Sequence, residues 1–280
     1  MSIGDKIKGL RTGKGMSQAE LAEKLNVSRQ AVTKWENDNG TPEVESLIAI
    51  ADLFEISVDA LVKDGAPVFS SAIQYDIETA KDFEFELTPC RSVTLEGHDS
   101  EKVRIEMTSD TIADLDSDLK ASIDDSRRNM NVKIRRKNDL TDSDCRENLT
   151  VRILLPRKYI GRIELETDVS DLHLRSFSTK DIEFGGSANT ITLKDVHGQA
   201  EMDVRSDCTF LVYDLDGSLE INQVDRSSVV KIPKDVGFRP VNAGRKCDLD
   251  VSKKLSSSDK SEDIIELNGM KSSLRIEALK

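Results

Sequence analysis

Hydrophobic residues recur with two different periods along this chain, and the change of period divides it into two parts. Up to about residue 63, apolar positions follow the three-and-four spacing of amphipathic helices. From about residue 83 they alternate with polar positions, as in half-buried β-strands. The pattern predicts a multidomain α and β protein, with a helical domain at residues 1–65, a linker at 66–82 and an all-β domain at 83–280.

The helical part is predicted to contain five short helices that share one core. Thr41-Pro42 predicts the start of the fourth helix, with threonine as the cap and proline at the first helical position. Ser57 is the predicted cap of the fifth. Their apolar positions, in chain order, are Ile3, Ile7 and Leu10; Leu21, Ala22 and Leu25; Ala31, Val32 and Trp35; Leu47, Ile50, Ala51 and Phe54; and Ala60 and Leu61.

The second and third helices carry clear start and stop signals. Ser17 and Glu20 have the spacing of a capping box, in which each side chain satisfies a backbone amide at the helix start. Asn26 is suited to the left-handed conformation that ends a helix sharply, and Ser28 can cap the next helix. Two short helices joined by such a turn make a helix-turn-helix.

Three segments resemble the phage-repressor or Cro-like helix-turn-helix family of bacterial regulators, also called the xenobiotic-response-element type. They are SQAELAEKL, VSRQAVTKWEN and TPEVESLIAIADLFEISVDAL, and the resemblance covers about residues 3–63. It implies that the start of the second helix contacts phosphate and that the third lies in the major groove of double-stranded DNA. The implied DNA-binding residues are Gln18 at phosphate, Ser28, Arg29, Gln30, Thr33 and Lys34 at the groove, and Asn37 at the backbone.

The chemistry of these side chains agrees with that role. Glutamine can pair with adenine, and arginine or lysine with guanine. The same resemblance matches Arg11 and Glu36 to a structural ion pair that orients the reading helix. Trp35 shares the apolar stripe of its helix and is expected in the core.

The β part begins with strand signals separated by polar stretches. Residues 108–130 are polar and acidic, and indicate a surface insertion or a short weak helix. The alternating apolar positions are Phe83, Phe85 and Leu87; Val93 and Leu95; Val103 and Ile105; Val132 and Ile134; and Val151, Ile153 and Leu155.

An internal repeat follows, built on an apolar-Glu-apolar unit. Its first positions are Ile163, Ile182, Ala200 and Leu219, at steps of 19, 18 and 19 residues. A second apolar unit follows each one, beginning at Leu172, Ile191, Phe210 and Val230. Two strands repeated at a fixed period predict a β-solenoid whose rungs bury their apolar sides on one another.

The repeat resembles the adhesin-type β-solenoid domain of bacterial proteins. Leu267, Leu274 and Ile276 are then expected to form the final rung. A β-sandwich of two sheets is the alternative architecture.

Charge is unevenly distributed. The chain has a net charge of −12, yet residues 1–40 contain seven Lys/Arg and five Asp/Glu. Positive charge is thus concentrated on the predicted DNA-facing helices. The acidic excess elsewhere is expected to limit non-specific DNA binding, which depends on phosphate neutralisation.

The remaining residues indicate no catalytic chemistry. The four cysteines, Cys90, Cys145, Cys208 and Cys247, lack metal-ligand spacing and are expected to be buried or idle thiols in a reducing compartment. We therefore expect no enzyme activity, no metal and no cofactor. The N-terminus lacks the apolar core of a signal peptide and the chain has no apolar run of membrane length, so a cytoplasmic location without membrane contact is expected.

Together these features predict a sequence-specific DNA-binding transcriptional regulator. We expect a repressor that binds a near-palindromic operator as a homodimer, because one helix-turn-helix reads only a few base pairs. A protein or small-molecule effector of the β-domain is a further expected partner. The alternative is an interaction scaffold whose β-domain binds a protein and whose helix-turn-helix only tethers it to DNA.

Overall fold

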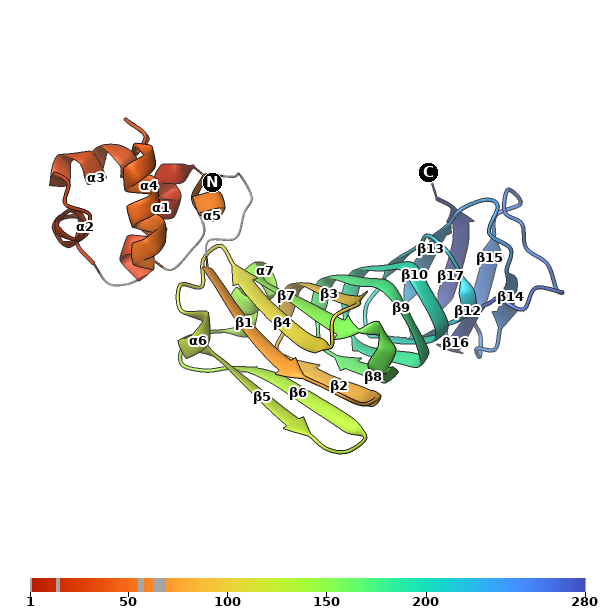
Figure 1. Cartoon of the computed structure of the whole chain (residues 1–280). Coiled ribbons are helices and arrows are strands. Elements are labelled where there is room, and N and C mark those ends of the chain that lie inside the picture. Colours follow the sequence, from red (N-terminus) through yellow and green to blue (C-terminus); the bar gives the residue numbers. More distant parts are fainter. Residues whose placement is uncertain (1, 14–15, 55–57, 63–68, 280) are drawn as a thin grey trace. The chain divides into compact units, whose positions relative to one another are not determined.

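The structure, a computed structural model, describes residues 2–13, 16–54, 58–62 and 69–279. The chain divides into two compact units. The first comprises Met1–Ser71 together with Met107–Asp118, and the second comprises Ala72–Glu106 together with Leu119–Lys280. A helical region thus precedes a large β-sheet region, as the change of hydrophobic period predicts (Figure 1).

The helical region packs around fully buried aliphatic side chains from every helix. The helices are α1 (Ile3–Gly13), α2 (Gln18–Lys24), α3 (Arg29–Glu36), α4 (Val44–Phe54) and α5 (Val58–Val62). Ile7, Leu21, Val32, Ile50 and Leu61 are all 0% exposed. In the described residues, no helix has both the length and the apolar character needed to cross a membrane.

Two details of the helical region differ from the sequence prediction. Helix α4 begins at Val44, and Thr41-Pro42 lies in the preceding loop. The first compact unit also contains α6 (Leu115–Asp118), so it has six helices in its described part rather than the five predicted. The predicted cap Ser57 and the predicted boundary at residue 65 fall outside the described residues.

Two polar segments that lacked a clear strand pattern nevertheless form strands. β1 (Phe69–Asp76) lies within the segment predicted as a linker, and it pairs with β4 (Lys102–Ser109). The acidic segment at 108–130 contains β5 (Leu119–Asp125), paired antiparallel with β6 (Asn129–Arg136), and not only a weak helix. In β1 and β5 only the first residue is buried and all the others are exposed or half-buried, so neither strand needs a long apolar row.

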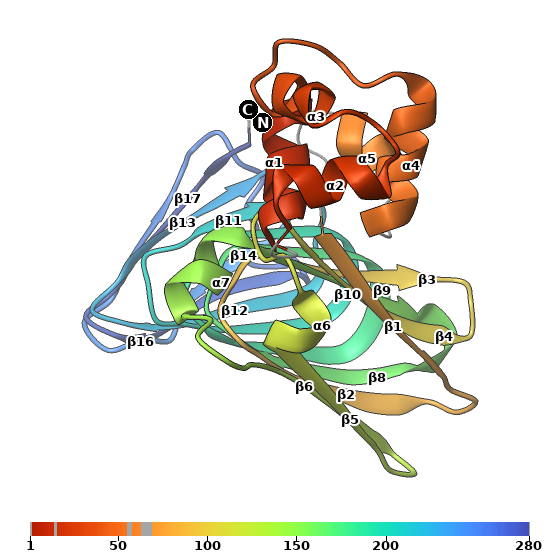
Figure 2. The same ribbon diagram turned by 90° about the vertical axis from the view of Figure 1, so that its left-hand side faces the viewer.

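The other predicted strands are present where the alternation places them. They are β2 (Lys81–Leu87), β3 (Cys90–His98), β7 (Leu149–Pro156), β8 (Ile160–Glu166), β9 (Val169–Gly186), β10 (Ala188–Val204), β11 (Thr209–Val212), β12 (Asp216–Val224) and β13 (Ser227–Ile232). Helix α7 (Asp142–Asn148) precedes β7, and a short 3₁₀ turn (Arg157–Tyr159) follows it. Figure 2 shows β2, β6 and β8 side by side in one sheet.

The sequence repeat corresponds to parallel, in-register pairing. Ile163 pairs with Ile182, Ile182 with Ala200, and Ala200 with Leu219. The second unit aligns in the same way, through the positions Leu172, Ile191, Phe210 and Val230. The predicted inward positions Leu165, Leu174, Phe184, Leu193, Met202, Val212, Ile221 and Ile232 are all buried, which confirms the assignment of faces.

The order of the strands at the C-terminal end differs from the prediction. The last strands of the chain are β16 (Ile264–Met270) and β17 (Ser273–Ala278), which were expected to end the stack. Instead β16 pairs with both β12 and β14 (Arg239–Asn242), and β17 pairs with both β13 and β15 (Asp248–Val251). The chain therefore passes outward to form β14 and β15, and then returns to fill the position between them and the repeat.

Two stacked glycines explain the sharp corners between repeats. Gly198 and Gly217 pair in register and have φ of 125° and 128°. A Cβ on Gly217 would collide with the carbonyl oxygen of Gly198, and a Cβ on Gly198 with that of Thr179. Only glycine fits such a corner, because the backbones approach closely at an angle that L-residues rarely adopt.

Candidate nucleic-acid interface

The helix-turn-helix is defined by local hydrogen bonds at its three junctions. The Ser17 hydroxyl accepts from the Glu20 amide at 3.2 Å, and Glu20 Oε2 accepts from the Ser17 amide at 2.7 Å, which completes the capping box. Asn26 has a φ of 53°, the left-handed conformation that ends α2. Ser28 caps α3 by accepting from the Ala31 amide at 3.1 Å.

Helix α3 has one buried side and one exposed side. Val32 and Trp35 are 0% and 8% exposed and fix the helix to the core. Arg29, Gln30 and Lys34 are exposed on the other side. The separation follows from the helical period, and it leaves three long hydrogen-bonding side chains free to contact a partner.

The other predicted DNA contacts already have partners within the protein. The Ser28 hydroxyl serves as the cap of α3, and Asn37 Nδ2 donates to the Thr33 carbonyl at 2.8 Å. Thr33 donates its hydroxyl to Gln18 Oε1 at 3.0 Å. These side chains are therefore positioned by the fold, and Ser28 and Asn37 remain exposed at its surface.

A buried ion pair joins α1 to the end of α3. Arg11 Nε lies 2.6 Å from Glu36 Oε1, and Arg11 Nη2 lies 2.9 Å from Glu36 Oε2. Gln18 Nε2 adds a third hydrogen bond to Glu36, at 2.9 Å. The Glu36 side chain is 2% exposed and that of Arg11 is 12% exposed, so the paired groups are largely removed from water.

The environment of Glu36 keeps it ionised. Burial alone would raise its pKa, but hydrogen bonds from Arg11 and Gln18 outweigh burial and lower the pKa below the usual value of 4.5. The hydrogen bond to Glu36 correspondingly raises the pKa of the Arg11 guanidinium. The pair is thus a permanent charge pair at neutral pH.

Sequence reasoning missed two features of this network. Gln18 is matched by the resemblance to a phosphate contact, yet its side chain connects Glu36 to Thr33 and so links α2 to the C-terminal half of α3. Arg11 Nη1 also donates to the Met16 carbonyl at 2.7 Å, which ties the α1–α2 loop to the same charge pair. Neither contact follows a helical period, so no local pattern could indicate them.

One of the seven Lys/Arg residues in the first 40 is buried. Lys6 lies on α1 beside the apolar face and is only 2% exposed. The exposed basic side chains of the helix-turn-helix itself are Lys24, Arg29 and Lys34. Positive charge at the predicted interface therefore comes from α2 and α3, and not from this position of α1.

The comparisons with known proteins concern mainly this region. The helix-turn-helix family profile matches residues 7–61. The chain is 45% identical over 62 residues to the HTH-type transcriptional activator BcrR of Enterococcus faecalis, covering 22% of this chain and 30% of that protein. It is 32% identical over 82 residues to the immunity repressor protein of Bacillus phage phi105, covering 29% of this chain and 57% of that protein. The chain thus spans 30% and 57% of the length of these two relatives.

Two solved structures are similar to parts of the chain. The P22 c2 repressor in complex with a synthetic operator is 30% identical, with a TM-score of 0.22, over 22% of this chain and 96% of the repressor. A protein of Clostridium sporogenes provisionally assigned to cell adhesion is 10% identical, with a TM-score of 0.33, over 75% of this chain and all of that one. The family match and the sequence relatives identify residues 7–61 as a helix-turn-helix domain of the type that transcriptional regulators carry.

Proposed function

We propose that this protein is a sequence-specific DNA-binding transcriptional regulator whose α3 reads bases in the major groove. The observation that carries the proposal is the exposed side of α3, where Arg29, Gln30 and Lys34 project away from the buried Val32 and Trp35. These side chains have the donors and acceptors that discriminate between base edges. Ser28 and Thr33 belong to the same groove-facing set, while Gln18 and Asn37 are proposed to contact the phosphate backbone beside them.

The regulator acts as a homodimer on a near-palindromic operator. One recognition helix reads only a few base pairs, so two copies are needed to select a single site in a genome. We assign it as a repressor, in the cytoplasm. Among the relatives, the phage phi105 protein is a repressor and BcrR an activator.

The β-domain is proposed to be a β-solenoid that provides an effector or oligomerisation function. Parallel pairing of successive repeats in register supports this architecture. The domain limits are proposed at residues 1–65 for the helical domain and 83–280 for the β-domain. Within the predicted linker at 66–82, β1 adds a strand to the sheet by pairing with β4. Stacked rungs give a rigid body on which a ligand site or a second subunit can be placed independently of the DNA-binding part.

The test is operator selection from random DNA with the full chain, followed by titration of substituted proteins. Gln30→Ala should weaken operator binding by about 1–3 kcal/mol while changing binding to random DNA much less. Glu45→Ala, at an exposed position of α4, is the matched control and should bind like the parent. Equal losses of Gln30→Ala on operator and random DNA would exclude base reading by this residue.

A further inference from the structure

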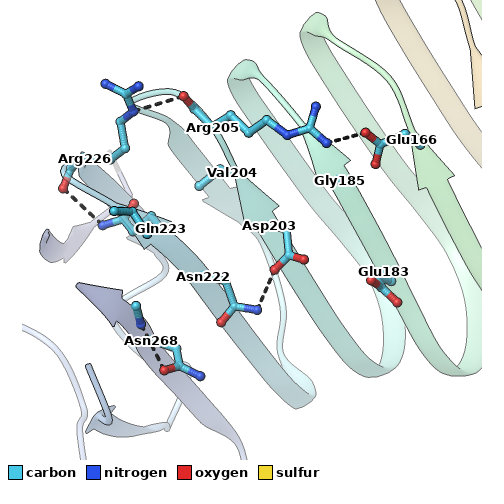
Figure 3. Close-up of a pocket in the computed structure, with 12 residues that line it drawn as sticks. Glu166, Glu183, Gly185, Asp203, Val204, Arg205, Asn222, Gln223, Arg226 and Asn268 are labelled. Atoms are coloured by element: carbon cyan, nitrogen blue, oxygen red, sulfur yellow. Dashed lines mark hydrogen bonds and ion pairs between the residues drawn. The ribbon is translucent and has the colours of Figure 1, made fainter. Parts of the chain in front are cut away.

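A groove of about 640 Å³ lies on the outer surface of the β-domain, where β8, β9, β10, β12 and β16 run side by side. Its volume is within the range of roughly 300–1,000 Å³ that is usual for small-molecule sites. Figure 3 shows that its lining combines carboxylates, amides and guanidinium groups. No DNA-binding role is proposed for this surface, which belongs entirely to the second compact unit.

The central group of the groove is an amide with a fixed orientation. Asn222 Nδ2 donates to Glu201 Oε1 at 2.8 Å and to Asp203 Oδ1 at 2.5 Å, so both of its hydrogens are used. Its Oδ1 must then point away from the carboxylates. That atom is inaccessible to solvent and has no hydrogen-bond partner in the described part of the chain. A buried acceptor without a donor is costly, and because no solvent-sized group reaches this oxygen, it lies behind the surface of the groove and is not itself a ligand contact.

The side wall of the groove supplies hydrogen-bond donors. Arg226 Nε donates to the Arg205 carbonyl at 3.0 Å, and the Arg205 guanidinium pairs with Glu166. The Arg226 backbone is held in turn by Gln223, which is 3% exposed and also bonds Ser228 and Ser273. Arg226 is exposed, and of its three guanidinium nitrogens only Nε has a hydrogen bond to the described residues. Its outer nitrogens can therefore donate to a ligand.

The rim of the groove is apolar at one point. Val224 lines it and is 54% exposed, and its in-register partner Met270 is 43% exposed. Such large apolar side chains are unusual at the surface of a strand whose other outward neighbours are polar. They offer a small flat contact for C–H groups beside the polar floor.

The charges of the lining nearly balance. Glu166, Glu183 and Asp203 carry three negative charges, and Arg205 and Arg226 carry two positive charges. A strongly charged ligand would therefore meet like charge at one side of the groove. A neutral ligand with many groups that both donate and accept hydrogen bonds could donate to the carboxylates of the lining and accept from its guanidinium groups.

We propose that this groove binds a neutral carbohydrate. Hydroxyl groups combine one donor with two acceptor positions, so they can donate to Asp203 while accepting from Arg226. The C–H face of a sugar ring would lie on Val224 and Met270. Because the donors and acceptors stand on paired strands and are held by hydrogen bonds among themselves, little ordering is needed on binding.

The proposal is tested by isothermal titration calorimetry of the full chain. The probes are D-glucose, N-acetyl-D-glucosamine, maltotriose and triacetylchitotriose, with spermidine and inorganic phosphate as a cationic and an anionic probe. At least one of the four sugars should bind saturably, and neither ion should bind the groove. Absence of binding by all four sugars at 10-millimolar concentration, on the order expected for weak single-site ligands, would overturn the proposal, as would groove-dependent binding of spermidine or phosphate alone.

Substitutions assign the binding to the groove. Arg226→Ala should weaken it at least about tenfold, since a charge-assisted hydrogen bond is lost. Arg226→Lys should retain part of it. Glu220→Gln is the matched control, because Glu220 lies on β12 outside the groove lining and should leave sugar affinity unchanged. Circular dichroism checks that each variant is folded. Equal affinity of Arg226→Ala and the parent would place the sugar elsewhere, and operator binding of the same samples reports separately on the proposed function.

Discussion

Replacing Glu36 with alanine is expected to destabilise the helical domain by about 3–5 kcal/mol, the usual cost of breaking a buried ion pair from one side. Three hydrogen bonds to the carboxylate disappear, two from Arg11 and one from Gln18. The Arg11 guanidinium then stays in a site where its side chain is only 12% exposed, with the Met16 carbonyl as its remaining acceptor in this network. The penalty comes mainly from this uncompensated charge.

The full chain contains its own reporter for this measurement. Trp35 is the only tryptophan, it neighbours Glu36 on α3, and it is 8% exposed. Its fluorescence therefore follows unfolding of the helical domain without interference from the β-domain. With a urea dependence of about 1 kcal/mol per molar for a small domain, the midpoint should fall by about 3 M or more.

A matched control and a double substitution make the result decisive. Glu23→Ala removes an exposed glutamate of α2 and should change stability by less than about 0.5 kcal/mol. The double variant Arg11→Met with Glu36→Leu should recover much of the loss, because apolar side chains can replace a buried pair at similar volume. A midpoint shift below about 0.5 M for Glu36→Ala would show that the pair contributes no more than an exposed one.

Three further outcomes are expected. Because the pKa of Glu36 is lowered in the folded state, the stability that ionised Glu36 adds is complete above the unfolded pKa of 4.5 and is lost as the pH falls through the folded pKa. Urea melts of Glu36→Gln followed by Trp35 fluorescence should therefore lack this acid-dependent loss of stability. Burial and the neighbouring Glu164, Glu201 and Asp203 raise the pKa of Glu183, so ionisation of this carboxyl destabilises the folded state as the pH rises above 4.5. Glu183→Gln should therefore raise the thermal midpoint of the β-domain at pH 7 and should give no such increase below about pH 4. An increase that persists below about pH 4 would refute the charge argument. Leu193→Asp places a carboxylate at a position that is 4% exposed and should abolish β-domain circular dichroism, and a native-like spectrum would contradict the stacked core.

The features that sequence could predict are those fixed within a few residues. Caps, turns and the helical period act over one helical turn, so Ser17, Glu20, Asn26 and Ser28 could be assigned their places from spacing alone. The strand pairing within the repeat could also be predicted from the sequence, because each in-register pair joins residues at the same position of successive units. Periodicity thus predicted both the inward positions and their partners.

The features that sequence could not predict depend on distant partners. β5 is stabilised by pairing with β6 and needs few apolar residues of its own. β14 and β15 are four-residue strands with weak alternation, and their position beyond β16 and β17 is decided by which strand edge remains open. A one-dimensional pattern contains no information about the order in which rungs are filled.

Glu36 poses a physical problem that its partner solves. A carboxylate at the C-terminal end of α3 opposes the helix dipole and lies in the helix proposed to approach phosphates. The positive charge of Arg11 neutralises the Glu36 carboxylate and so offsets its repulsion by both the helix dipole and the phosphates. Arg11, however, belongs to α1 and not to the two helices of the helix-turn-helix. The direction in which Gln30 and Lys34 point is therefore set partly from outside the helix-turn-helix. Transferring residues 17–37 alone to another scaffold would carry the reading side chains but leave Glu36 without the arginine that fixes their helix, and the transferred segment should lose orientation before it loses helicity.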